Sequence, residues 1–161
     1  MISDKMTAAI NDQIRAELDS AYSYLGMAAY LQDCNLSGMA HWMKKQYHEE
    51  LEHVEKFIEY LYERGARVKI GEIAKPRENY DGPLSVFEEA LKHEQYVTAR
   101  IYKLVDQALE EKDHATHSML KWFVDEQVEE EANAEAIVRK LEFVGDSNSS
   151  VYLLDKELGA R

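Results

Sequence analysis

The placement of the helix-breaking residues limits the fold of this chain more than any other feature. Both prolines and most glycines lie between residues 65 and 83 or near residues 38 and 145, which leaves four long stretches almost without them. We expect an all-α protein, because a β-sandwich would need turn residues roughly every 8–12 positions. The stretches predict four long helices and a short fifth one, at about 4–34, 38–64, 84–111, 115–143 and 149–159.

Each long stretch carries apolar residues at alternating spacings of three and four, a seam typical of helices that pack nearly parallel or antiparallel in a bundle. The seam of the third stretch comprises Leu84, Phe87, Leu91, Glu94, Thr98, Ile101 and Val105. Every seam contains a glutamate near its middle, and these four residues are Glu17, Glu50, Glu94 and Glu130. In a bundle of helices of similar length, the four carboxylates share one layer and face one another.

The lengths of the connections predict how the helices are arranged. The first and second helices, like the third and fourth, are joined by only a few residues and must be antiparallel neighbours. Residues 65–83 could span roughly 60 Å when extended, whereas a helix of about 27 residues is roughly 40 Å long. This connection can therefore cross the whole bundle from end to end. We expect the bundle itself to comprise residues 4–143, approximately. With 161 residues in all, we expect one domain over 1–161.

Four buried carboxylates need a partner of opposite charge. An unpaired buried carboxylate costs several kcal/mol, and a whole protein is typically stable by only about 5–15 kcal/mol. Protonation could neutralise the layer, but two divalent cations would also satisfy the oxygen lone pairs. His53 lies three residues after Glu50 on the same helix face and supplies a nitrogen ligand, the Glu-x-x-His spacing of di-iron and di-manganese bundles. A carboxylate-rich site with one imidazole suits iron or manganese.

At these residues the chain resembles the non-haem bacterial ferritins over nearly its whole length. The segments that carry the resemblance are QIRAELDSAYSYLGMAAY, KKQYHEELEHVEKF, KPRENYDGPLSVFEEALKHE and KWFVDEQVEEE. The resemblance implies a ferritin-like four-helix bundle with one long crossover and a short fifth helix. It also implies a homo-oligomeric hollow shell of 24 subunits, in which four copies of the fifth helix meet. The apolar stripe Val151, Leu154 and Leu158 predicts that this helix packs on a neighbour.

The resemblance further implies a ferroxidase centre with two irons. Glu17, Glu50 and His53 would hold one iron, and Glu50 would bridge to the other. Glu94 and Glu130 would hold that second iron.

Further residues are implied around this centre. Gln127 would form a hydrogen bond to oxygen or water beside the irons. Tyr24, on the same seam as Glu17, can reach the carboxylates with its hydroxyl, and the resemblance implies that it donates electrons with help from Trp122. The alternative for Tyr24 is a packed aromatic ring with a satisfied hydroxyl. A third iron site is implied at Glu49, Glu126, Glu129 and Glu130, although the last three also describe an ordinary acidic helix face.

At three places the sequence differs from other ferritin-like proteins, and each difference changes what we expect of the metal centre, haem binding or iron entry. Asn133 stands where other di-iron bundles repeat the histidine, so the second iron lacks an imidazole. Leu51 stands where a haem-binding bacterioferritin has its axial methionine, so no haem is expected. The stretch that often supplies acidic pore residues in ferritins carries His114, His117 and Leu120 instead, which leaves the iron entry route open.

The leading hypothesis is an iron-storage protein with ferroxidase activity. It would oxidise Fe(II) with O2 or H2O2 and deposit Fe(III) mineral inside the shell. One alternative is a di-iron oxidase or peroxidase acting on a separate small substrate, which would keep its metal and form no mineral. Another is a scaffold bundle with protonated glutamates, which would not depend on metal.

Charge and cysteine content guide the remaining expectations. The formal net charge of −12 repels nucleic acid and anionic lipid and concentrates cations near the surface. Partners are therefore expected to be other copies of the chain and iron, with no nucleic acid and no membrane. The single cysteine, Cys34, and an N-terminus without an export signal predict a cytoplasmic protein.

Overall fold

The computed structural model describes residues 1–145 and 147–160, and every regular element within these ranges is a helix. The prediction of an all-α fold is confirmed, and each expected helix lies within one residue of its predicted bounds. The five helices are α1 (Asp4–Asp33), α2 (Ser37–Glu63), α3 (Pro83–Glu110), α4 (His114–Val144) and α5 (Asn148–Leu158). None of the described helices combines the length and the apolar character needed to cross a membrane.

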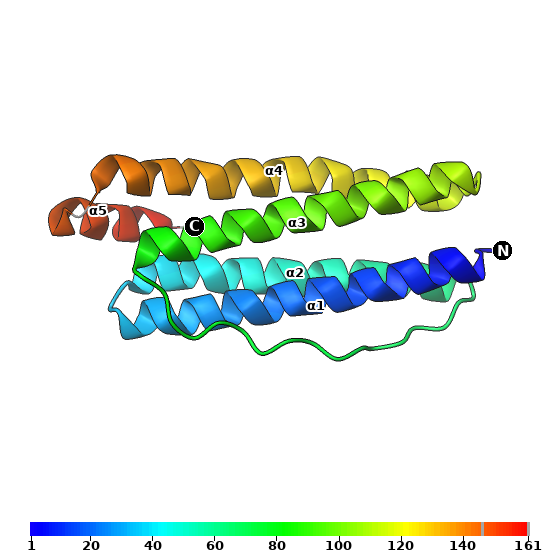
Figure 1. The fold of residues 1–161 in the computed structure, drawn as a ribbon, viewed down its shortest axis with the longest axis horizontal. Coiled ribbons are helices and arrows are strands. Elements are labelled where there is room, and N and C mark those ends of the chain that lie inside the picture. Colours follow the sequence, from blue (N-terminus) through cyan, green and yellow to red (C-terminus); the bar gives the residue numbers. More distant parts are fainter. Residues whose placement is uncertain (146, 161) are drawn as a thin grey trace.

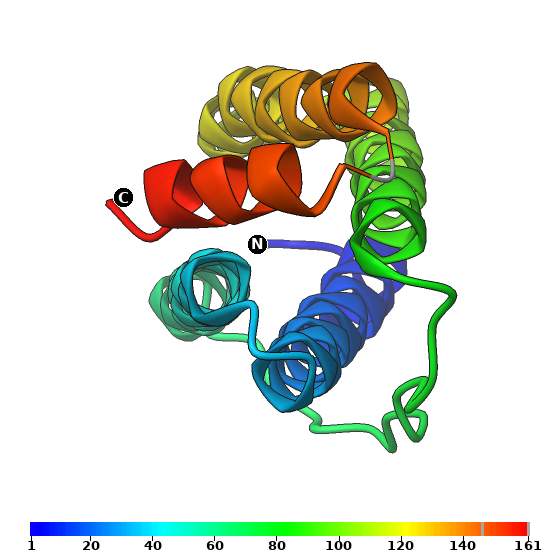
Figure 2. The ribbon, with the colours of Figure 1, turned by 90° about the vertical axis from the view of Figure 1, so that its left-hand side faces the viewer.

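The four long helices form a bundle built from two antiparallel hairpins (Figure 1). α1 packs mainly on α2, and α3 packs mainly on α4. α3 also contacts α1, so this pair of helices joins the hairpins along one side (Figure 2). Short turns at 34–36 and 111–113 close the hairpins. The antiparallel pairs inferred from connection length are therefore present.

The predicted long crossover, residues 64–82, runs beside α1 from one end of the bundle to the other (Figure 1). Its backbone is fixed to α1 at several points: for example, Asn11 Nδ2 donates to the carbonyl oxygen of Arg67 at 3.0 Å. Gly26 allows the crossover to approach α1 closely, since a Cβ there would lie 2.9 Å from Cβ of Pro76. This contact explains a glycine in the interior of α1, where it would otherwise weaken the helix.

The apolar core consists of two clusters along the bundle axis. One contains Tyr24, Met27, Met43 and Phe87 among its members, and it extends to α5. The other is built around Ile10, Ile14, Phe57, Ile101 and Phe123. Along each of the four long helices, the seam glutamate lies between residues of one cluster and residues of the other. Apolar packing therefore shields the carboxylate layer from both ends of the bundle.

The seam predicted for α3 needs a correction. Leu84, Leu91 and Val105 are only partly buried, although the other members of that seam are covered. The buried apolar residues of α3 are Val86, Phe87, Ala90, Val97, Ile101, Leu104 and Ala108. α3 packs against both α4 and α1, so its inward face is wider and rotated relative to a seam that faces one partner.

α5 lies across one end of the bundle, between the start of α2 and the end of α4 (Figure 2). Leu154 and Leu158 are buried against the bundle and Val151 is partly buried, so the predicted packing of this helix occurs within the same chain. The Met39 backbone N–H donates to Asp155 Oδ1 at 2.8 Å. Gly38 permits this contact, because a Cβ there would lie 1.8 Å from the Asp155 carbonyl oxygen.

Candidate metal centre

The four seam glutamates are all buried in the middle of the bundle. One comes from each long helix, because each stands near the midpoint of its seam and the middle of every seam faces inward. Their exposed fractions are 0 % for Glu17, 2 % for Glu50, 1 % for Glu94 and 4 % for Glu130. Unlike typical surface glutamates, these carboxylates are removed from water and must be neutralised within the fold.

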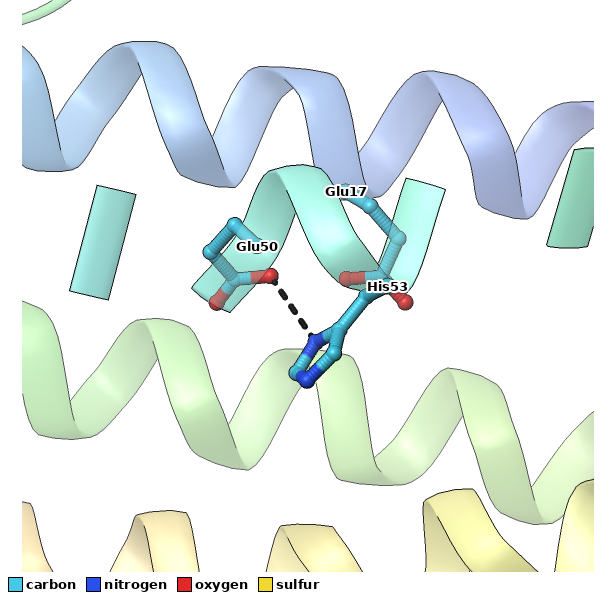
Figure 3. A group of neighbouring side chains, drawn as sticks. All are labelled: Glu17, Glu50 and His53. Atoms are coloured by element: carbon cyan, nitrogen blue, oxygen red, sulfur yellow. Dashed lines mark ion pairs between the residues drawn. The ribbon is translucent and has the colours of Figure 1, made fainter. Parts of the chain in front are cut away.

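Three of the predicted ligands form a compact group. One ligand atom each from Glu17, Glu50 and His53 lies within 4.8 Å of the other two, and Figure 3 shows these side chains converging from α1 and α2. Opposite ligand atoms around a divalent transition metal are about 4.2 Å apart when each bond is about 2.1 Å long. Small side-chain movements would therefore close the group around one ion.

The same three residues each carry a buried polar atom without a hydrogen-bond partner. These atoms are Glu17 Oε2, Glu50 Oε2 and His53 Nδ1. His53 Nδ1 lies 3.4 Å from Glu50 Oε2 (Figure 3), but the two atoms do not form a hydrogen bond. Leaving a buried polar group unsatisfied typically costs about 1–3 kcal/mol. A bound cation would satisfy all three atoms together, so the donor set fits a metal such as iron.

The carboxylate of Glu94, on α3, is held by other side chains. The hydroxyl of Tyr24 donates to Glu94 Oε1, and Gln127 Nε2 donates to Glu94 Oε2 at 3.2 Å. On α4, Glu130 Oε2 accepts from Gln46 Nε2 at 2.7 Å. The structure thus places Tyr24 and Gln127 beside the carboxylate layer, within reach of the predicted second metal position.

Burial raises the pKa values of the glutamates in this layer. The pKa of Glu17 rises to about 8, mainly through burial and then through the charge of Glu50. Burial, followed by the charge of Glu94, raises the pKa of Glu130 to about 7. The pKa values of Glu50 and Glu94 also rise, with burial as the largest cause. Without a cation, the layer therefore retains protons near neutral pH.

The residues predicted for a third iron site are less closely grouped. Glu49 and Glu126 are partly buried and Glu129 is exposed. Burial and the charge of Glu94 are the main causes that raise the pKa of Glu130. The charge of Glu49 raises it further, so the carboxylates of Glu49 and Glu130 interact. Within residues 1–145 and 147–160, however, Glu17, Glu50 and His53 make the only compact group of three ligands. The third site remains a prediction.

Trp122 connects His53 with the protein surface. The indole ring meets the His53 ring edge-on with centroids 5.5 Å apart, and 39 % of the tryptophan is exposed. Lys56 Nζ lies over the same indole ring, 4.1 Å from its centroid. This position places Trp122 next to the centre, and its help in electron donation stays a prediction.

The sequence analysis did not predict the contact that Gln13 makes with the centre. Its Nε2 donates to Glu17 Oε1 at 2.8 Å, and its Oε1 accepts from Arg100 Nε at 2.9 Å. The spacing of Gln13 and Glu17 puts the two side chains on one helix face and could have revealed the first bond. The second bond depends on which helix lies beside α1, which the spacing does not show.

Comparison with known proteins agrees with this architecture. The sequence model of the ferritin-like domain matches residues 7–144. The chain is 44 % identical to a bacterial non-heme ferritin of Bacteroides fragilis (strain 638R) over 161 residues, covering 100 % of both chains. Identity to a bacterial non-heme ferritin of Staphylococcus aureus (strain USA300) is 39 %, covering 100 % of this chain and 97 % of the other.

A solved structure has nearly the same backbone. The open-pore ferritin of Archaeoglobus fulgidus superposes with a TM-score of 0.99 at 47 % identity, covering 100 % of this chain and 99 % of that one. The sequence matches extend over nearly all of the chain, and the structural match includes the crossover and α5. On this evidence the chain belongs to the ferritin family.

Proposed function

We propose that this protein stores iron and oxidises Fe(II) in the centre of its bundle. The observation that carries the proposal is the buried layer of four carboxylates, in which Glu17, Glu50 and His53 each leave one polar atom unsatisfied. Fe(II) would enter this layer as a substrate and displace the protons that the glutamates hold. Membership of the ferritin family supports iron as the ion.

Each side chain has a defined part in this proposal. Glu17 and His53 would bind the first Fe(II), Glu50 would bridge, and Glu94 and Glu130 would bind the second. Two Fe(II) ions supply two electrons, which reduce O2 to H2O2 or H2O2 to water. Holding both ions beside one oxidant removes the need for a chance encounter. The concentrated negative charge favours Fe(III), the more highly charged product.

The second position would bind its ion less firmly than the first. Its ligands are carboxylates alone, because Asn133 stands where a second histidine would follow Glu130. The carboxylates of Glu94 and Glu130 are also shared with Tyr24, Gln127 and Gln46. Such a position suits an ion that leaves after oxidation. We place a third, accessory iron at Glu49, Glu126, Glu129 and Glu130, where acidic groups lie between the centre and the surface.

Storage also requires an enclosed space, which one bundle does not provide. We propose a shell of 24 copies of the chain. Large apolar side chains are exposed on the described surface, including Leu25, Phe143, Tyr152 and Leu153, and such residues favour contacts between copies. The similar Archaeoglobus fulgidus protein is described as an open-pore ferritin, of which a closed form has been engineered. Pores and closure are properties of an enclosing assembly.

One experiment separates storage from a di-iron oxidase or peroxidase acting on another substrate. Fe(II) is added aerobically to the purified metal-free protein, and the product is sized and analysed for iron per chain. A large particle holding many irons per chain supports storage. A small species that keeps about two irons per chain would instead favour the oxidase, and a protein that binds no iron would overturn both. A Glu50→Gln variant serves as the reference for iron deposited without the centre.

A further inference from the structure

The two carboxylate oxygens of Glu17 have different surroundings. Oε1 accepts a hydrogen bond of 2.8 Å from Gln13 Nε2. Oε2 is buried and has no hydrogen-bond partner. Both residues are fully buried, so water does not compete for either oxygen. The carboxylate thus has one oxygen already engaged and one available to a metal ion.

Arg100 determines which end of the Gln13 amide faces Glu17. An arginine side chain can only donate hydrogen bonds, and Arg100 Nε donates to Gln13 Oε1 at 2.9 Å. The amide nitrogen must then point toward Glu17, where it donates. If the amide were reversed, its oxygen would face the carboxylate and its N–H groups would face the guanidinium, and both contacts would be repulsive.

Arg100 is itself fixed by residues at the surface of the bundle. Its Nη2 donates to Asp12 Oδ2 at 2.7 Å, and its Nη1 donates to the Tyr96 hydroxyl at 3.2 Å. Asp12 accepts a hydrogen bond from Arg15 Nη2 as well, at 3.0 Å. A continuous chain of hydrogen bonds therefore leads from Asp12 through Arg100 and Gln13 to Glu17.

We propose that Arg100 and Gln13 are positioning residues that turn Glu17 Oε2 toward the first Fe(II) and restrict Glu17 to binding through that single oxygen. The inference rests on the proposed function, since it takes Fe(II) as the ion that binds. Residues that orient a metal ligand through a hydrogen bond typically change metal affinity by about 10–100-fold when they are replaced. Arg100 acts only through Gln13, so its effect requires the amide.

The test uses anaerobic binding of Co(II), whose visible spectrum reports the ligands around it and which needs no oxidation step. Arg100→Leu and Gln13→Leu should each weaken binding of the first Co(II) about 10-fold and change its spectrum. The double variant should be no worse than Gln13→Leu alone, because one residue acts through the other. Arg15→Gln, which loses the ion pair with Asp12 but leaves the amide bonds intact, should bind as the wild type does.

Thermal unfolding of each metal-free variant shows whether it retains the fold. Because Arg100 is at the edge of the bundle, Arg100→Leu gives a result even if the buried Gln13→Leu fails to fold. Unchanged affinity and spectrum in Arg100→Leu, or effects of the two replacements that simply add, would overturn the positioning role. Aerobic Fe(II) oxidation by the wild type tests the proposed function separately. A wild type that binds no Co(II) would overturn the positioning role, whereas a wild type that does not oxidise Fe(II) would overturn the proposed function.

Discussion

Tyr24 on α1 donates its hydroxyl to a carboxylate oxygen of Glu94 on α3, so a side chain of the first helical hairpin holds a predicted metal ligand of the second. Gln46 on α2 makes the corresponding bond to Glu130 on α4, at 2.7 Å. The carboxylate layer is thus one place where buried polar contacts join the two hairpins. We therefore expect stability and metal binding to be coupled at this layer.

Replacing His53 by alanine removes the nitrogen ligand of the compact group. We expect the initial rate of Fe(II) oxidation to fall at least about tenfold, equivalent to about 1.4 kcal/mol of transition-state stabilisation. Stopped-flow absorbance after aerobic addition of Fe(II) measures this rate. His48→Ala, an exposed change on the same helix, is the matched control. An unchanged rate in His53→Ala would refute the role assigned to this residue.

Glu17→Gln should stabilise the metal-free protein at alkaline pH. Burial and the charge of Glu50 raise the pKa of Glu17 to about 8, so at about pH 9 the folded wild type carries an unfavourable buried charge that glutamine lacks. Below about pH 4.5 the Glu17 carboxyl is protonated in both the folded and the unfolded state, so the two proteins should unfold alike there. Each kcal/mol corresponds to roughly 2–4 °C in Tm for a chain of this size. The variant should lose the further stabilisation that Co(II) gives the wild type.

The stability of the metal-free protein and the stabilisation that bound metal adds to it should change with pH in opposite directions. The folded-state pKa values of Glu17 and Glu130, about 8 and about 7, lie above the ordinary value of 4.5. Between about pH 4.5 and 8 the folded state therefore binds more protons than the unfolded state, and the free energy of unfolding falls as pH rises.

Bound metal replaces these protons, so the stabilisation that metal provides should increase over the same pH range. Denaturant unfolding at several pH values, with and without Co(II), measures both trends. A metal-free protein that becomes more stable between pH 5 and pH 8 would contradict the assignment of buried, protonated glutamates.

Tyr24→Phe removes the hydroxyl that donates to Glu94 but keeps the aromatic ring in the core. The loss leaves Glu94 Oε1 without this bond and should cost about 1–3 kcal/mol of stability in the metal-free protein. We also expect slower Fe(II) oxidation, because Glu94 is less firmly held. Tyr30→Phe provides the control: it removes a hydroxyl that donates to the Tyr80 carbonyl oxygen at 2.8 Å, away from the carboxylate layer. Equal oxidation rates in both variants would exclude a role for the Tyr24 hydroxyl.

Gly38→Ala should affect storage more than oxidation. The new Cβ would lie 1.8 Å from the Asp155 carbonyl oxygen, so α5 must move away from the start of α2. We expect the initial oxidation rate to be retained while assembly size and iron per chain fall, as measured by sedimentation and iron analysis. In Gly71→Ala the Cβ meets only the flexible side chain of Arg15, at 3.1 Å, and both properties should be unchanged. Normal assembly by Gly38→Ala would show that the docked position of α5 is not needed.

The sequence allowed the helices, their pairing and the crossover to be predicted because each depends on local spacing or on connection length. The carboxylate layer followed from the midpoints of the four seams. What local spacing does not determine is which helix lies beside α1 across the bundle. The inward face of α3 depends on the contact between α1 and α3, so the α3 seam, which included the partly buried Leu91, was misplaced. The bond between Arg100 and Gln13 depends on the same contact, so Gln13 was missed.

The crossover of residues 64–82 also has a consequence for biosynthesis. It divides the chain into two hairpins. Within each hairpin the contacting residues are separated by relatively few positions in the sequence, and such units fold quickly. The first hairpin brings Glu17, Glu50 and His53 together, but Glu130 belongs to α4 and leaves the ribosome much later. If the protein works as proposed, a nascent chain would offer one ion a place to bind but not a pair, and iron oxidation would begin only when synthesis of the bundle is complete.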